Sequence, residues 1–144
     1  MRTIIRHLLA VAVVLAALAA PRAAFAQSFK VIVNSGNATE ELSADQASKI
    51  FLKQAKFPGG AAATPVDQAK SAAVRAEFTK AVHGKSVAAV ESYWQQQIFS
   101  GKDVPPASKA SDDDVVAFVK ATPGAIGYVS GAAKVDGVKV VAVK

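Results

Sequence analysis

The sequence predicts a single α/β domain, because short β-branched segments and capped helical patterns follow one another along most of its 144 residues. "FKVIV" at residues 29–33 is short and β-branched, which is typical of a buried strand. "GVKVVAV" at residues 137–143 is a second such segment. Between them lie four patterns of helical period, each preceded by a serine: Ser43, Ser71, Ser86 and Ser111. Intermixed strands and helices indicate one stack of layers around a sheet.

Residues 1–26 have the features of a secretory signal peptide. Two arginines precede an uninterrupted apolar run of 13 residues at 8–20, which Pro21 follows. A helix that crosses a bilayer needs roughly 20 residues, which disfavours the alternative of an uncleaved membrane anchor. "AFA" at 24–26 places small residues where a signal peptidase cleaves. We therefore predict cleavage before Gln27, a domain spanning residues 27–144, no membrane anchor after cleavage and a periplasmic location.

The charge and the missing residue types exclude several classes of protein. Without the three arginines of the leader, the chain has 14 Lys and Arg residues against 11 Asp and Glu residues, a net charge of +3. No basic run is long enough for a nucleic-acid surface, so nucleic acid is not an expected partner. The chain has no cysteine, and His83 is its only histidine after the leader, which argues against a zinc site or a Ser-His-Asp triad elsewhere. We expect no cofactor, no metal site and no enzymatic activity.

The first helix is predicted over residues 44–53. Ser43 is its N-cap, Gln46 is the capping-box partner, and Leu42 is the preceding hydrophobic residue. The inner face of this helix consists of Ala47, Ile50 and Phe51. "KFPGGAAATP" then predicts a loop, and residues 64–66 predict a short strand.

The second and third helices are separated by Gly84, which is expected to end the second helix in the left-handed conformation. The second helix is predicted to begin after its N-cap Ser71, with inward-facing residues four apart: Val74, Phe78 and Val82. The third follows the N-cap Ser86, and its apolar stripe consists of Val87, Val90, Trp94 and Ile98. Because Trp94 belongs to this stripe, we expect it in the core rather than in a ligand site. His83 lies at a helix C-terminus, where a protonated imidazole is favoured, and is interpreted as structural.

The fourth helix is predicted after Ser111. Three aspartates occupy its first turn, where negative charge complements the helix dipole: Asp112, Asp113 and Asp114. The alternative of a Ca²⁺ loop is disfavoured, because the glycine and the distal glutamate of such a loop are missing. "TPGAIGYV" then leads into a strand, and a turn at Asp136-Gly137 precedes the terminal strand.

Four segments, taken in order, resemble the phosphate-type periplasmic solute-binding proteins of ABC transporters. They are "LSADQASKIFLKQ", "PVDQAKSAAVRAEF", "YWQQQIFSG" and "ASDDDVVAFVKATPGAIGYV", and with the first strand they extend from Val31 to Tyr128. The resemblance is closest to the short secreted members of that superfamily. It implies a single lobe of a type II periplasmic-binding-protein-like fold, with a central mixed sheet flanked by about four helices. Full-length members have two lobes that close on a ligand, and one lobe cannot close a cleft on itself.

The resemblance also implies a candidate anion site at the start of the second helix. In full-length phosphate binders, a segment of the type Arg-x-Asp-Gly-Ser-Gly-Thr opens this helix and holds the oxyanion. Aligned on "VRAEF", this chain has Gln68 for the Arg and Lys70 for the Asp, and Ser71 supplies a hydroxyl one position early. The candidate ligand-binding residues are Gln68, Lys70, Ser71, Ala72, Ala73 and Val74. The alternative is that Ser71 only caps a helix.

Two functions from different classes are open at this point. The first is a periplasmic solute-binding-type protein related to phosphate transport, which binds phosphate or another small oxyanion weakly or serves as an accessory of an ABC permease. The second is a one-lobed protein-interaction module without a small ligand, which contacts another periplasmic or membrane protein. A helix N-terminus and Lys70 favour the first. The missing Arg and Thr of the motif favour the second, because each would donate a hydrogen bond to a charged ligand.

Overall fold

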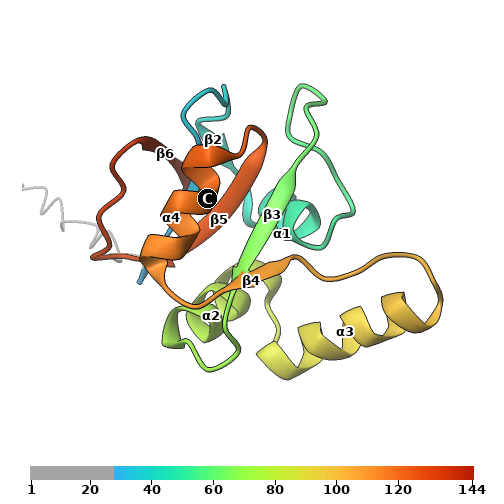
Figure 1. Ribbon diagram of the computed structural model, residues 1–144. Helices are drawn as coiled ribbons and strands as arrows, with labels where there is room; N and C mark the ends of the chain where they lie inside the picture. The colour runs from blue at the N-terminus through green and yellow to red at the C-terminus, as the bar shows by residue number, and fades with distance from the viewer. Residues whose placement is uncertain (1–27) are drawn as a thin grey trace, which may run out of the picture.

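A mixed sheet of six strands forms the centre of the computed structural model, which describes residues 28–144 (Figure 1). The strands are β1 (Phe29–Asn34), β2 (Glu41–Leu42), β3 (Thr64–Gln68), β4 (Ala107–Lys109), β5 (Ala125–Ser130) and β6 (Val138–Val143). The helices are α1 (Ala44–Phe51), α2 (Ala73–Phe78), the π-helical segment η1 (Thr79–His83), α3 (Val87–Phe99) and α4 (Asp112–Ala121). The predicted α/β class, with a central mixed sheet and four α-helices, is confirmed. The predicted signal peptide, residues 1–26, lies outside the described residues.

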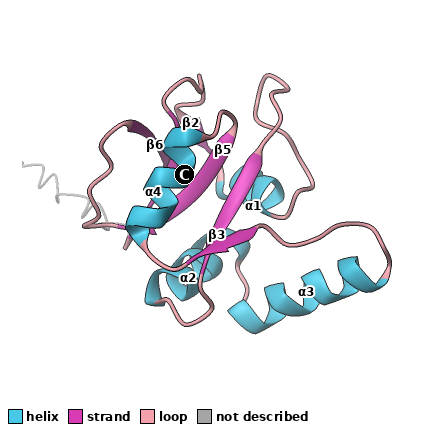
Figure 2. Cartoon of the chain, in the orientation of Figure 1, coloured by secondary structure: helices cyan, strands magenta, loops and turns pink. Residues whose placement is uncertain are grey.

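The strand order brings the ends of three strands to one edge of the sheet. The order is β2-β6-β1-β5-β3-β4, with β1 antiparallel to β5 and β6. β3 runs parallel to both β4 and β5. The C-terminal ends of these three parallel strands, Gln68, Lys109 and Ser130, therefore lie at the same edge (Figure 2). Open α/β sheets place their ligand sites beyond such an edge.

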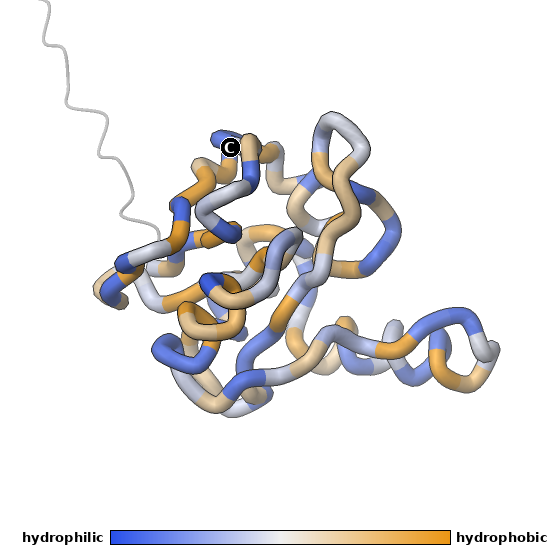
Figure 3. Tube along the Cα trace, turned by 45° about the horizontal axis from the view of Figure 1, so that its top comes forward, coloured by the Kyte–Doolittle hydropathy of each residue, from blue (hydrophilic) through white to orange (hydrophobic). Residues whose placement is uncertain are grey.

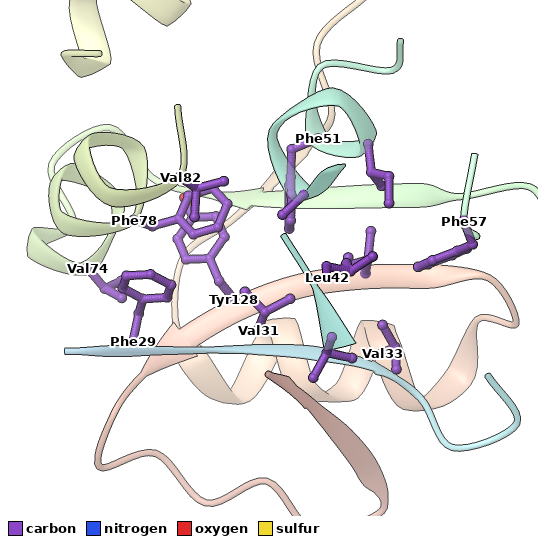
Figure 4. Packing of buried hydrophobic residues seen from close by; sticks show 14 residues of the cluster. Phe29, Val31, Val33, Leu42, Phe51, Phe57, Val74, Phe78, Val82 and Tyr128 are labelled. Carbon is purple, nitrogen blue, oxygen red and sulfur yellow. The ribbon is translucent and has the colours of Figure 1, made fainter. Parts of the chain in front are cut away.

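Alternate residues of β1 enter two separate hydrophobic clusters. Val31 and Val33 join a cluster that includes residues of α1, α2 and η1, whereas Ile32 joins a cluster that includes residues of α4. This division follows from the two-residue side-chain period of a strand. Helices thus cover both faces of the sheet. Figure 4 shows the first cluster, in which Phe78 stacks on Tyr128 with ring centroids 3.8 Å apart.

Three of the four predicted helix N-caps are present. At the start of α1, the N–H of Gln46 donates to Ser43 Oγ at 3.1 Å, and the N–H of Ser43 donates to Gln46 Oε1 at 2.9 Å. The capping box predicted from the sequence is therefore complete. Ser86 and Ser111 cap α3 and α4 through their hydroxyl oxygens. α1 ends at Phe51, two residues before the predicted end.

The predicted N-cap of the second helix is wrong. α2 begins at Ala73, and its N-cap position is Ala72, whose side chain cannot accept a hydrogen bond. The chain turns just before this point, where the N–H of Ala72 donates to the carbonyl of Ala69 at 2.9 Å. This turn leaves Ser71 exposed, one residue too early to cap the helix. The helix continues as η1 and ends at Gly84, which adopts the predicted left-handed conformation with φ 64°.

α3 extends away from the rest of the molecule, as Figures 1 and 3 show. Val90 and Trp94 on its inner face are buried as predicted, and Trp94 is only 3% exposed. The prediction that Ile98 shares this buried stripe is wrong, because its side chain is 53% exposed near the projecting end of the helix. Phe99, the last residue of α3, is 94% exposed. The projecting end of α3 is therefore apolar and uncovered.

Two short strands, β2 and β4, are not predicted by the sequence patterns. They form the two edges of the sheet, and each is held by parallel pairing, β2 with β6 and β4 with β3. Segments of two or three residues have no period that a sequence pattern could reveal. Among residues 28–144, no helix has the length and apolar character that a membrane span requires.

Candidate functional site

The six candidate residues surround the turn between β3 and α2, at the edge where three parallel strands end. We call this region the β3–α2 edge and define it as residues 67–75 together with the side chains that contact them. A hollow of about 710 Å³ lies at the opposite edge of the sheet, near Asn34 and Gly124, and none of the six residues lines it. The candidate residues are thus brought together, but around an open turn.

Gln68 is a structural residue of this edge. It is buried, and its side-chain Nε2 donates to Asp112 Oδ1 at 2.8 Å and to the carbonyl oxygen of Tyr128 at 3.0 Å. The same Asp112 oxygen accepts from the N–H of Ser130 at 3.1 Å. Gln68 and Asp112 therefore join the ends of β3 and β5 to the start of α4. The amide of Gln68 does not replace the guanidinium that the resemblance implies at this position.

The other five candidate residues divide into exposed and buried groups. Lys70, Ser71 and Ala73 are exposed, Ala72 is half-buried, and Val74 is buried in the first hydrophobic cluster. Lys70 Nζ lies 2.7 Å from Glu91 Oε2. The N–H groups of Ala73 and Val74 lie in the first turn of a helix, where the chain supplies no intrahelical acceptor. Lys70, Ser71 and Ala73 are therefore open to solvent, whereas Val74 is not.

Arg75 is the main residue of this edge that the sequence reasoning missed. Its guanidinium is buried, and Nη1 donates to the carbonyl oxygen of Gln68 at 3.0 Å. Nη2 lies 2.7 Å from Glu91 Oε1 and 3.3 Å from Asp67 Oδ2. One signal was present in the sequence: Arg75 is the only arginine after the leader, since every other basic residue there is lysine. A single arginine in such a chain indicates a role for its planar fork of donors.

The carboxylate of Glu91, on α3, lies between two cations. One carboxylate oxygen contacts Lys70 and the other contacts Arg75, each at 2.7 Å. Burial by itself raises the pKa of Glu91, but the hydrogen bonds and charges of Lys70 and Arg75 outweigh it, so that the net pKa is lowered. Glu91 is therefore ionised at neutral pH and acts as an internal ligand of both cations.

Tyr128 and Asp67 complete the buried polar network. The hydroxyl of Tyr128 donates to Asp67 Oδ1 in a short hydrogen bond, and it accepts from the N–H of Gln68 at 3.2 Å. Burial, followed by the nearby Asp67 carboxylate, raises the pKa of Tyr128. The hydroxyl therefore remains a neutral donor. For residues 28–144, each fully buried side-chain nitrogen or oxygen has a partner, so the network has no unfilled position inside the protein.

Asp112, the first of the three aspartates, is also bound within the protein. Burial raises the pKa of Asp112, but hydrogen bonds from Gln68 and Ser130 outweigh this effect, and the net pKa is lowered. Within the described part of the chain, no group of three or more His, Cys, Asp or Glu residues could hold a metal ion. The Asp112 carboxylate thus connects α4 to the ends of β3 and β5.

His83 contacts α1, and the modest preference of a helix C-terminus for a protonated imidazole is outweighed at this position. Its Nδ1 lies 2.7 Å from Ser48 Oγ on α1. Burial, then the charges of Lys85 and Arg75, lowers the pKa of His83 to about 4. The helix-terminus effect, typically below about 1 kcal/mol, is smaller than this combined penalty. His83 is therefore a neutral structural residue at pH 7.

Two of the solved structures that are similar to this fold are described as phosphate transport proteins. A Clostridium perfringens protein described as a phosphate ABC transporter substrate-binding protein, with bound phosphate, aligns with a TM-score of 0.64 at 20% identity. An ABC-type phosphate transport receptor of Vibrio cholerae aligns with a TM-score of 0.59 at 16% identity. Both alignments cover 81% of this chain, but only 44% and 46% of those chains. No protein-family model matches the sequence, and no curated protein matches it.

These comparisons define the class of fold. The chain has the fold of a single lobe of a periplasmic-binding-protein-like structure, and it spans less than half the length of the structures that it resembles. At these identities the likeness concerns the fold alone.

Proposed function

We propose that this chain is a single-lobed, solute-binding-type protein of the periplasm, related to phosphate ABC transporter substrate-binding proteins, that binds a small oxyanion weakly at the β3–α2 edge. Phosphate is the ligand to test first, because a similar fold was solved with bound phosphate. An enzymatic role is not proposed, because the polar side chains of this edge bind one another, with Arg75, Asp67 and Glu91 in ion pairs.

The observation that carries this proposal is the arrangement of two cations around one carboxylate. Lys70 and Arg75 contact the two oxygens of Glu91, each at 2.7 Å. A carboxylate is itself an oxyanion, so the edge already holds a group of the same chemistry as phosphate or sulfate. Lys70 is 70% exposed in its side chain and can turn toward a ligand in solvent. Charge-assisted hydrogen bonds of this kind are stronger than neutral ones.

The same arrangement explains why binding is expected to be weak. An external oxyanion must compete with Glu91 for Lys70, and the side chain of Arg75 is only 6% exposed. We expect a millimolar dissociation constant, about −4 kcal/mol of binding free energy. At about 10 mM phosphate, a 1 mM site would stabilise the fold by roughly 1.4 kcal/mol.

Calorimetric titration of the refolded, phosphate-free protein with phosphate and sulfate tests this function. Lys70→Ala should weaken binding several-fold, and Glu91→Gln should tighten it, because the internal competitor loses its charge. Lys49→Ala is the matched control, since Lys49 forms a 2.7 Å ion pair with Asp45 on α1 and should not affect binding. A micromolar constant for the unmodified protein, or equal effects of Lys70→Ala and Lys49→Ala, would contradict the proposal. Circular dichroism confirms that each variant is folded.

A second candidate function is that of a protein-interaction module without a small ligand, such as an accessory of an ABC permease or of another membrane protein. The exposed apolar end of α3 favours it, because Ile98 and Phe99 lie together there and are 53% and 94% exposed. If calorimetric titration detects no binding of phosphate or sulfate, this second candidate function is favoured.

The periplasmic location depends on the leader and has its own test. Expressed with residues 1–26 in a Gram-negative host, the protein should be released by osmotic shock with Gln27 as its first residue. N-terminal sequencing that returned Met1 on membrane-bound material would contradict cleavage.

A further inference from the structure

The outer face of α3 differs from an ordinary helix surface, because its exposed residues include no charged side chain. Lysine, arginine, aspartate and glutamate form 19% of the chain. The exposed residues of α3 are Ala88, Ala89, Ser92, Gln95, Gln96, Ile98 and Phe99. Its only charged residue, Glu91, points inward to Lys70 and Arg75. The absence of charged side chains and the presence of an exposed phenylalanine are two features that interface cores share.

The two ends of this face differ in shape. At the C-terminal end, Phe99 projects with 94% of its surface exposed. At the N-terminal end, a hollow of about 600 Å³ opens beside Ala88. Its lining consists of Ala76, Lys80, Gly84, Lys85, Ser86, Val87 and Ala88. One end of α3 thus presents a large apolar side chain, and the other end has a space lined mainly by small residues.

The spacing of the exposed residues places both features on one stripe. Ala88, Ser92, Gln95 and Phe99 are four, three and four residues apart, so they share one side of the helix. Ala88 and Phe99 are separated by about 17 Å along the axis, at 1.5 Å per residue. If two copies of α3 pack antiparallel about a two-fold axis, Phe99 of each copy meets Ala88 of the other, and Ser92 meets Gln95.

The charges around α3 agree with this antiparallel arrangement. The first turn of α3 has no acidic residue and its last turn has no basic residue, so neither end of its dipole is compensated. Antiparallel pairing places the negative C-terminal end of one α3 beside the hollow of the other, where Lys80 and Lys85 supply positive charge. The two dipoles then oppose each other favourably.

We propose that the outer face of α3 is a homodimer interface, in which each Phe99 inserts into the hollow beside Ala88 of a second copy. The contact is isologous, because the same surface acts on both sides of the axis. The two phenylalanines together bury up to about 300–500 Å², so the rest of the α3 face must supply most of the roughly 1,200 Å² that specific complexes bury. A micromolar dissociation constant is expected. The inference is independent of oxyanion binding at the β3–α2 edge.

Sedimentation equilibrium of the mature chain over a concentration series tests the dimer. The unmodified protein should pass from monomer to dimer as its concentration rises, and Phe99→Ser should weaken this association at least tenfold. Val140→Ser is the matched control, because Val140 is an exposed apolar residue, 44% exposed, on β6. It should associate like the unmodified protein. A monomer at all concentrations, or equal behaviour of the two variants, would overturn the proposal and leave the apolar end of α3 to a different partner protein.

Cross-linking tests the antiparallel geometry. The chain has no cysteine, so single cysteines can be introduced without interference. A mixture of Ser92→Cys and Gln95→Cys proteins should form a covalent heterodimer with a short bis-maleimide faster than Ser92→Cys mixed with Lys134→Cys, a position outside α3. A dimer that forms in solution without preferential cross-linking between positions 92 and 95 would overturn the assignment of this face.

Discussion

Arg75, on α2, connects β3 to α3 at the β3–α2 edge. Its guanidinium binds the carbonyl oxygen of Gln68 and the carboxylate of Asp67 on β3, and the carboxylate of Glu91 on α3. A buried cation with two carboxylate partners costs desolvation free energy, which the ion pairs and hydrogen bonds offset. Removing the cation alone takes the guanidinium away from the Asp67 carboxylate and leaves Glu91 with one of its two cations, Lys70. Arg75 therefore helps to hold α3 in place, together with the buried side chains of Val90 and Trp94.

Arg75→Met should lower the free energy of unfolding by about 3–5 kcal/mol, as breaking a buried ion pair does. Glu91→Gln should lower the free energy of unfolding by less. The side chain of Glu91 is 27% exposed, and the amide oxygen of the introduced glutamine can still accept a hydrogen bond from Arg75. The double variant should be more stable than the sum of the two losses predicts, with a coupling of about 0.5–3 kcal/mol. Urea unfolding of the four proteins measures this cycle. Strict additivity would show that the two side chains do not interact in solution.

His83 should make stability depend on pH. Its pKa in the folded protein is lowered to about 4 from 6.5, so between these values the unfolded chain binds more protons. The stability from this residue is therefore complete above pH 6.5 and is lost as the pH falls toward 4, at up to about 1.4 kcal/mol per pH unit. His83→Gln should reduce the slope of unfolding free energy against pH in this window. Parallel slopes for the two proteins would mean that the imidazole is solvated.

At the scale of elements, sequence patterns predicted the helix ends correctly where the hydrogen bonds of the cap join neighbouring residues. The capping box of Ser43 and Gln46 and the glycine terminator at Gly84 depend on residues within four positions of each other, and all were predicted. The N-cap prediction failed at Ser71, because the turn at Ala69 is fixed by β3 and β4 rather than by neighbouring side chains. The N–H of Ala69 donates to the carbonyl of Lys109. A pairing 40 residues away along the chain leaves no local pattern.

The candidate site was harder to predict than the fold for the same reason. Its position at the end of β3 could be predicted, because a strand, a turn and a helix follow one another in the sequence. Its contents could not, because Glu91 and Tyr128 reach the edge from α3 and β5. The apolar period of α3 was correct for Val90 and Trp94. The same period predicted burial of Ile98 wrongly. The spacing of apolar residues shows which side of a helix is apolar, but it does not show how far along the helix other elements cover that side.

Gly127 on β5 fixes how closely α4 packs on the sheet. A Cβ atom there would lie 2.7 Å from the Cγ1 atoms of both Val115 and Val66. Gly127→Ala should therefore cost about 1–3 kcal/mol through overpacking, measured by denaturant unfolding. Gly36→Ala is the control, because its Cβ would make only an ordinary contact of 3.4 Å, and a change within about 0.5 kcal/mol is expected. Equal stability of the two variants would show that α4 shifts without cost.

At the scale of the whole molecule, the described residues form one sheet that is covered on both faces by helices. β1 joins the two sides of the sheet through pairing with β5 and β6, and its residues enter both hydrophobic clusters. A sheet joined in this way moves as one body, because closure between rigid bodies needs a hinge with few contacts across it. A bound oxyanion therefore has no second body within residues 28–144 to draw closed.

This architecture predicts that phosphate does not change the size of the protein in solution. For the roughly 117 described residues, a compact monomer has a radius of gyration of about 13 Å, which the projecting α3 increases slightly. Small-angle scattering at low protein concentration should give superposable curves with and without about 10 mM phosphate, where a millimolar site is mostly occupied. At high concentration, dimerisation through α3 should raise the radius equally under both conditions. A reproducible decrease on adding phosphate would contradict the single-body description, because only closure of one part of the chain onto another could produce it.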